Sequence, residues 1–489
     1  AALLAGLPGL PLAGAPSPWR ALTEVGAAEL ICATDQWITP QRCSPSSEQG
    51  RALLVLSFRL AAGAVGAKAG AEALTVVISN MASQLAADRG MVNECCSRLR
   101  ELCLGASGLP PSARERLLKG AVGPLISRLP EEAELRAAVE ALASELRAAA
   151  PPACSEDAPA AGKVVATRLL FQLLAAPETQ NPELSLELLA AHWPWLEAAV
   201  AAPAAAEAGA EAACSALTAA ISRARGRPVA REALLRATPV LAAAAARRGS
   251  AAALGALGTL VRVFRGFADD ADAARQVAAE IAGLTRQLLA GADAAAAEQR
   301  MAQLPPDLLA ALLELLTTAL GQRKAALALE LFRTPGLLLA VASPVAGALH
   351  CYANPRIVCW GLLFCERLPP WAQQQEFAPH AGPVLEAVLP IVAEACCRLL
   401  ASSPVAQDLE VCGACAKLLL TLARALPGPM EAALRGAALR IGVPAQESEL
   451  LQQQIADPLA TEDGLAEALR DTAVSWQVEH LRRSLAAGG

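Results

Sequence analysis

The chain has 489 residues, of which 54% are hydrophobic and only 3% are aromatic. Alanine and leucine dominate, and both favour helix, whereas strands concentrate aromatic and β-branched residues, so the composition predicts an all-α protein. The formal net charge of -6 argues against a dedicated nucleic-acid binder, because contacts to phosphates need a basic surface.

Neither a membrane span nor a secretory signal is expected. The longest uncharged run lies between Arg333 and Arg356 and is broken by Pro335 and Pro344. A spanning helix needs about 20 mainly apolar residues without such breaks. The opening residues, AALLAGLPGLPLAGAPSP, lack the positive segment of a signal peptide. Because the chain begins with Ala1 rather than Met, we expect it to be a piece of a longer protein.

Helical patterns follow one another along the whole chain. In the first half the predicted helices span 18–38, 48–63, 68–87, 89–105, 116–129, 130–147, 163–175, 182–200, 203–225 and 228–247. In the second half they span 250–267, 270–290, 293–302, 306–320, 322–333, 335–351, 355–367, 379–400, 404–426, 429–441, 445–456 and 461–485. Proline-rich residues 39–50 and 148–161 predict the longest surface loops.

The pattern is clearest in residues 116–147, which predict two amphipathic helices joined at Pro130 almost without a loop. One such hairpin cannot bury its apolar stripes alone, so it needs similar neighbours. Helix pairs recur at about 40 residues, the period of HEAT-type repeats. We therefore predict a right-handed α-solenoid of HEAT-like hairpins that runs as one domain over residues 1–489.

The sequence offers little chemistry. The 14 cysteines are interpreted as reduced core thiols, because most lie within helical patterns. Cys412 and Cys415 have the CxxC spacing, but a zinc site needs a second pair at matching spacing, so core packing is favoured. The four histidines form no HExxH, and no G-x-S-x-G elbow is present. We expect no enzyme activity, no metal and no cofactor.

Three stretches resemble, in order, the C-terminal half of the importin-13/transportin-3 group of β-karyopherins. RLLKGAVGPLISRLP (116–130) is similar to that group's LLKG…ARLP helix. HWPWLEAAV (192–200) is similar to its WP-x-L helix, and EALRDTAVSW (467–476) to its closing ALRDFT helix. The spacing of the three stretches also agrees with the family.

The resemblance implies a HEAT superhelix that acts as a nuclear transport receptor and shuttles between nucleus and cytoplasm. Such a receptor binds protein cargo on its concave face, Phe-Gly nucleoporins on its outer face, and the small GTPase Ran. The family's main Ran contacts lie in an N-terminal arm that this chain is expected to lack. Neither nucleic acid nor membrane is expected as a partner. The alternative is a HEAT/armadillo-type structural scaffold or regulatory subunit of a multiprotein complex.

One departure from the family concerns the helix that follows WP-x-L. In part of the family this helix carries a row of arginines that reads phosphorylated Arg-Ser segments. Here the matching positions are Ala212, Ser215, Thr218 and Ser222. Recognition of phosphate uses bidentate guanidinium contacts, so we do not expect this helix to bind Arg-Ser cargo.

Four arginines lie just beyond that helix and are candidates for binding an anionic partner: Arg223, Arg225, Arg227 and Arg231. The alternative is that they face solvent at a helix C-terminus, where the dipole favours cations.

Two tryptophans are also candidate partner-binding residues, because aromatic side chains are scarce in this chain and exposed ones often anchor interfaces. Trp193 and Trp195 lie two residues apart, so they occupy different faces of the predicted helix. Core packing is the alternative for both.

Overall fold

The computed structural model describes ten ranges of the chain: 28–32, 47–63, 68–85, 89–104, 182–201, 207–224, 227–264, 270–289, 300–457 without 302, and 460–488. Scattered positions between 116 and 174, and residue 267, are also described. Every regular element in these residues is a helix, which confirms the all-α prediction. The predicted loop at 148–161 lies outside the described residues, and only scattered positions of the predicted hairpin at 116–147 lie within them.

The internal contacts divide the chain into two compact units, Ala1–Ala233 and Leu234–Gly489. The prediction that one solenoid runs unbroken over all 489 residues therefore stays a prediction.

Unit 1 contains short amphipathic helices that follow the predicted boundaries closely. The described helices are α3 (Glu48–Gly63), α4 (Lys68–Leu85), α5 (Arg89–Leu104), α10 (Pro182–Ala191), α11 (Trp193–Val200) and α12 (Glu207–Arg223). Helices α3, α4 and α5 pack on one another around buried Leu54, Phe58, Leu74 and Ile78. The predicted loop 39–50 ends earlier than expected, because α3 already begins at Glu48.

The single helix predicted over 182–200 is wrong, because the structure breaks it into α10 and α11 at His192. Pro194 is the reason. Its ring has no N–H to donate and clashes with the carbonyl one turn earlier, whereas proline is tolerated in the first turn of a new helix. The chain therefore ends one helix and starts another within the stretch HWPWLEAAV.

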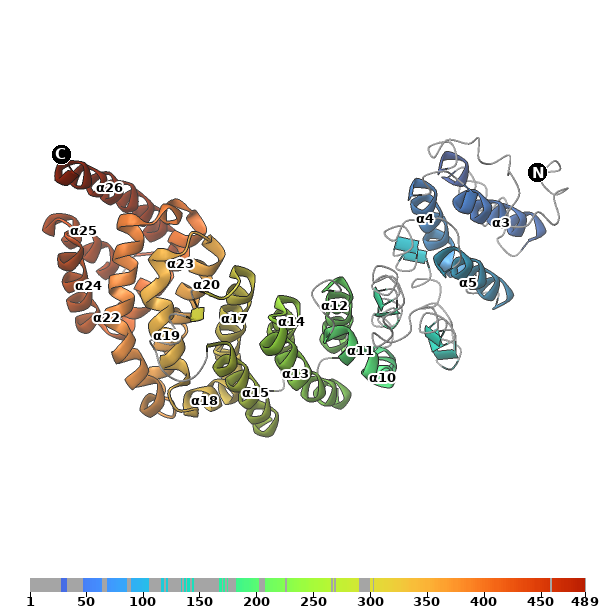
Figure 1. Ribbon diagram of the computed structural model, residues 1–489, viewed down its shortest axis with the longest axis horizontal. Coiled ribbons are helices and arrows are strands. Elements are labelled where there is room, and N and C mark those ends of the chain that lie inside the picture. The colour runs from blue at the N-terminus through green and yellow to red at the C-terminus, as the bar shows by residue number, and fades with distance from the viewer. Residues whose placement is uncertain are drawn as a thin grey trace. The chain divides into compact units, whose positions relative to one another are not determined.

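Helix α13 (Pro228–Arg248) leads into unit 2, which is a stack of helices in two layers (Figure 1). The first layer is α14 (Ala251–Val263), α17 (Pro306–Ala319), α20 (Pro355–Glu366), α23 (Leu409–Ala425) and α26 (Glu462–Gly488). The second is α15 (Ala271–Leu289), α18 (Ala325–Arg333), α19 (Leu337–Ala348), α22 (Ala378–Ser402), α24 (Pro427–Ile441) and α25 (Ala445–Ala456). Each first-layer helix packs on the next, and α22 joins the layers by packing on α26. This arrangement confirms the predicted all-α solenoid of stacked helices.

The core of unit 2 lies between and within these layers and consists mainly of leucine and alanine. Helix α17 is the clearest example of a helix buried on nearly all sides. From Leu308 to Ala319 every side chain is buried except those of Glu314 and Thr318, which lie four residues apart on one face. A helix that is apolar almost all round is one surrounded by other helices.

Side-chain caps fix where several helices begin. Asp270 Oδ1 accepts a hydrogen bond from the backbone N–H of Ala273 at 2.9 Å and so caps α15. Asn354 and Asp408 cap α20 and α23 in the same way. The helix predicted over 355–367 ends as α20 at Glu366, and the Pro369-Pro370 pair that follows lies inside a short helix, α21 (Leu368–Ala372). Proline in the first helical turn removes only an N–H that has no partner there.

No single helix in the described part of the chain is both long and apolar enough to cross a membrane. One bent pair of helices meets the same criteria of length and composition when its two parts are taken together. The pair consists of Ala325–Arg333 and Leu337–Cys351, which meet at an angle of 90°.

Candidate functional site

The two candidate tryptophans belong to α11 and differ in burial. Trp193 is 3% exposed, and its indole Nε1 donates a 2.8 Å hydrogen bond to Glu197 Oε1 one turn later. Trp195 is half-buried. The structure therefore places Trp193 in the core and leaves Trp195 as the member of the pair with surface to offer a partner.

The candidate arginines lie around the junction of α12 and α13. Arg223 is exposed at the last residue of α12, where a cation complements the helix dipole. Arg227 is also exposed and forms an ion pair with Glu183 of α10 at 3.0 Å. Arg231 is half-buried in α13, and Arg225 lies outside the described residues. At least one of the four charges is thus balanced within the protein.

The positions that carry arginines in part of the resembled family lie on the accessible side of α12. Ser215 is exposed, and Ala212, Thr218 and Ser222 are half-buried. Thr218 Oγ1 donates its hydrogen bond to the carbonyl of Ser215 at 3.0 Å. This face of α12 therefore carries no positive charge at these four positions.

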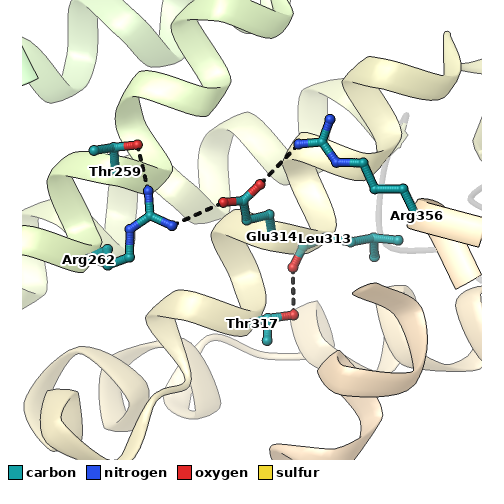
Figure 2. A network of polar contacts seen from close by, with 6 residues as sticks. All are labelled: Thr259, Arg262, Leu313, Glu314, Thr317 and Arg356. Atoms are coloured by element: carbon teal, nitrogen blue, oxygen red, sulfur yellow. Dashed lines mark hydrogen bonds and ion pairs between the residues drawn. The ribbon is translucent and has the colours of Figure 1, made fainter. Parts of the chain in front are cut away.

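Two arginines share one carboxylate in a network that links three helices of the first layer (Figure 2). Glu314 of α17 accepts a hydrogen bond on Oε1 from Arg262 of α14 at 3.3 Å. Its Oε2 accepts one from Arg356 of α20, also at 3.3 Å. Thr259 Oγ1 accepts a further bond from Arg262 at 3.0 Å. Both guanidinium groups remain more than half exposed, so the network presents a net positive charge to solvent.

A second shared carboxylate lies in the other layer. Glu394 of α22 receives Arg398 Nη2 at 2.8 Å on Oε1 and Arg440 Nε of α24 at 2.9 Å on Oε2. Partial burial acts to raise the pKa of Glu394, but the hydrogen bonds from Arg398 and Arg440 outweigh it and hold that pKa below its usual value. The three residues border an open cavity of about 330 Å³ that also includes His350. Partial burial and the nearby Arg398 lower the pKa of His350.

Sequence reasoning missed both networks. Glu314 lies 52 residues after Arg262 and 42 residues before Arg356, which is close to the period of the helix pairs. Aligning successive pairs on their apolar stripes is the signal that would have brought these charges together. Exposed arginines are frequent anchors at protein interfaces, so both layers carry groups suited to contacting a partner.

The CxxC pair lies in the core of unit 2. Cys412 and Cys415 are buried, and the thiol of Cys412 donates to the carbonyl of Ala406 at 3.0 Å. A hydrogen bond with Cys396 and then burial raise the pKa of Cys415 well above its usual value. In the described part of the chain no three metal-ligating side chains come together. The burial of both thiols confirms the core-packing interpretation.

No family model matches this chain, and no curated protein is similar to it. Among solved structures, one match is described as "Circular tandem repeat protein with novel repeat topology and enhanced subunit contact surfaces". It shares 14% identity and covers 96% of this chain and 100% of its own, with a TM-score of 0.29. At that score the likeness adds nothing to the helices and contacts described above.

Proposed function

We propose that this chain is a non-catalytic, protein-binding solenoid of the nuclear transport receptor type. In this role it carries protein cargo through nuclear pores by binding cargo, Phe-Gly nucleoporins and Ran, and it shuttles between nucleus and cytoplasm. The observation that carries the proposal is the occurrence, in family order, of three stretches similar to importin-13/transportin-3 helices. The stacked helices of unit 2 are the kind of scaffold on which such a receptor is built.

The chemistry of the exposed groups supports binding rather than catalysis. Arg262 and Arg356 flank one carboxylate on the first layer, and Arg398 and Arg440 flank another on the second. Paired in this way, the guanidinium groups are held in place but keep donors free for a partner. Recognition is then spread over several helices, with a few well-placed side chains supplying most of the affinity.

The cargo class follows partly from α12. Its exposed face carries Ser215 where an arginine is needed for phosphorylated Arg-Ser segments. The proposal therefore assigns this chain to cargo other than Arg-Ser proteins.

Retention on immobilised Phe-Gly repeats tests the proposal with the 489-residue chain. We expect the chain to be retained on Phe-Gly repeats and to pass through a matched column in which serine replaces each phenylalanine. Far-UV circular dichroism of the same sample establishes that it is helical. A helical chain that passes through both columns would overturn the transport proposal and leave a HEAT-type scaffold.

A further inference from the structure

An open cavity of about 760 Å³ lies among three successive helices of the first layer, α20, α23 and α26. The first turns of all three helices border it, through Pro355, Glu410 and Glu462. Cys359, Leu363 and Ala414 form apolar parts of its wall. None of these elements belongs to the sites predicted from the sequence.

The cavity owes part of its space to a glycine. Gly413 lines it in the second turn of α23, and a Cβ at this position would meet no atom within 4 Å. Glycine in a helix interior costs roughly 0.5–1 kcal/mol relative to alanine. No close packing of helices explains the missing side chain, so at this position Gly413 leaves the cavity open.

Trp360 supplies an aromatic surface within the cavity. It is half-buried on α20, and within the described residues its indole N–H donates to no acceptor. The other two tryptophans of unit 2 differ, since Trp371 and Trp476 are nearly inaccessible. A tryptophan face exposed in this way attracts a cation through the ring quadrupole.

The charges at the mouth are mostly negative. Glu410, Glu462 and Asp463 line it, and none of the three forms an ion pair in the part of the chain that the structure describes. The cations in the lining are Arg356 and Lys417, and Arg356 is already bound to Glu314 at 3.3 Å. Three unpaired carboxylates therefore face the solvent-filled space.

A buried carboxylate also acts on the charges of the cavity. Glu366 lies one turn beyond Leu363 on the same face of α20 and is 6% exposed. Its Oε2 makes no hydrogen bond, and the nearest cation, Arg367 Nε, is 3.6 Å away. Glu366 interacts electrostatically with both Lys417 and Glu462 of the lining. Burial raises the pKa of Glu366, so Glu366 does not cancel the charge of Lys417. Among the described residues the three carboxylates of the lining still outnumber Lys417, the one cation of the lining that forms no ion pair.

We propose that this cavity, formed by Trp360, Gly413, Glu410, Glu462 and Asp463, binds an arginine side chain from a basic segment of a partner protein. The planar guanidinium stacks on the Trp360 indole and donates to the carboxylates at the mouth. The inference deepens the proposed function, on which it rests in taking the ligand to be part of a protein.

Fluorescence anisotropy of labelled peptides tests this site on the 489-residue chain. The probes are three nine-residue Gly-Ser peptides that carry three arginines, three lysines or three glutamates. We expect binding of the arginine peptide, at least threefold weaker binding of the lysine peptide, and none of the glutamate peptide. Affinity for the arginine peptide falls as salt rises, because the contacts are ionic.

Three variants assign the binding to the cavity. Gly413→Leu fills the open space and favours helix, so it is expected to weaken binding at least tenfold without lowering the melting temperature. Trp360→Ala and the double change Glu462→Gln with Asp463→Asn are each expected to weaken it at least fivefold. Asp307→Asn removes a matched carboxylate from the first turn of α17, outside the cavity, and leaves binding unchanged.

The outcomes separate this inference from the proposed function. Equal binding of the arginine and glutamate peptides, or full affinity in a folded Gly413→Leu variant, would overturn the site. If the chain is then still retained on Phe-Gly repeats, the transport proposal survives without it. Specific arginine binding in a chain that Phe-Gly repeats do not retain would support the site and contradict the transport proposal.

Discussion

Lys324 Nζ donates a 2.8 Å hydrogen bond to the backbone carbonyl of Phe264, 60 residues earlier in the chain. The bond ties the start of α18 to the residue that ends α14. The ammonium also lies 5.1 Å from the centre of the Phe267 ring. Lys324 itself is only 8% exposed. A cation at a helix C-terminus complements the dipole, yet its burial is costly.

This burial makes stability depend on pH. Burial lowers the pKa of Lys324 to about 8 from an ordinary value of 10.5. Between these two values the unfolded chain binds more protons than the folded chain, so the free energy of unfolding rises with pH. The full rise corresponds to about 3 kcal/mol, at 1.36 kcal/mol for each pKa unit. Below pH 8 both states are protonated and the contribution is flat.

Lys324→Met is the corresponding test, because methionine has a similar shape and no charge. We expect the free energy of unfolding, measured in urea between pH 7 and pH 10, to rise with pH in the parent chain. In the variant this rise should be absent. Comparing the two chains removes the effect of cysteines and other groups that titrate in the same range. Parallel pH profiles of the two chains would contradict the role given to Lys324.

Replacing Trp371 is expected to lower the stability of the protein strongly. Its indole Nε1 donates a 2.8 Å hydrogen bond to the carbonyl of Leu320, and its ring lies 4.4 Å from that of Phe377. Trp371→Ala is expected to cost about 3–5 kcal/mol, and Trp371→Phe about 1–3 kcal/mol because the Leu320 carbonyl loses its donor. Urea unfolding measures both. Trp360→Phe is the matched control at a half-buried position and should cost under about 1 kcal/mol.

Removing the Glu314 carboxylate is expected to lower the stability slightly, by an amount that depends on salt. Glu314→Gln removes the carboxylate shared by Arg262 and Arg356, both more than half exposed, so we expect a loss of about 1 kcal/mol. Ions screen such pairs, and the loss should shrink in 1 M sodium chloride. The control is Glu386→Gln, an exposed carboxylate on α22. An equal loss in the control, or one that salt leaves unchanged, would argue against the network.

Cysteine labelling distinguishes the core thiols from the surface ones. The hydrogen bond with Cys396 and then burial raise the pKa of Cys415. Cys351, in contrast, is exposed. Because the thiolate is the reactive form, iodoacetamide at pH 8 should modify Cys351 and spare Cys415 in the native chain. Mass spectrometry of peptides reads out each site, and both should react in urea. Equally rapid native labelling of Cys415 would show that this part of the core is not closed.

Much of the fold was predictable because helix ends carry local signals. The helices predicted from residues 355 and 270 begin as α20 at Pro355 and α15 at Ala271, where Asn354 and Asp270 supply the caps. The errors also have local causes. Pro194 breaks the helix predicted over 182–200 into α10 and α11, and Pro369-Pro370 lies in a short helix, α21, that was not predicted. A proline's effect depends on the turn of the helix in which it falls, and the sequence pattern leaves that position open.

The site was far less predictable, since it depends on residues brought together from different helices. Glu314 and its two arginines lie more than 40 residues apart along the chain, and a charged residue on a helix normally indicates only a solvated face. The cavity beside Trp360 needs a missing side chain at Gly413 in the neighbouring helix. A glycine inside a helical pattern gives no hint of which element it faces.

Binding to Ran tests the proposed role in nuclear transport. The protein to use is this chain together with any residues that precede it in its reading frame, because the main Ran contacts of the resembled family lie in an N-terminal arm. Its affinity is measured for Ran loaded with GTP and then with GDP, on protein shown to be folded by circular dichroism. We expect tight binding to the GTP form alone. Equal binding to both forms, or no binding to either, would contradict a transport receptor and leave a helical scaffold.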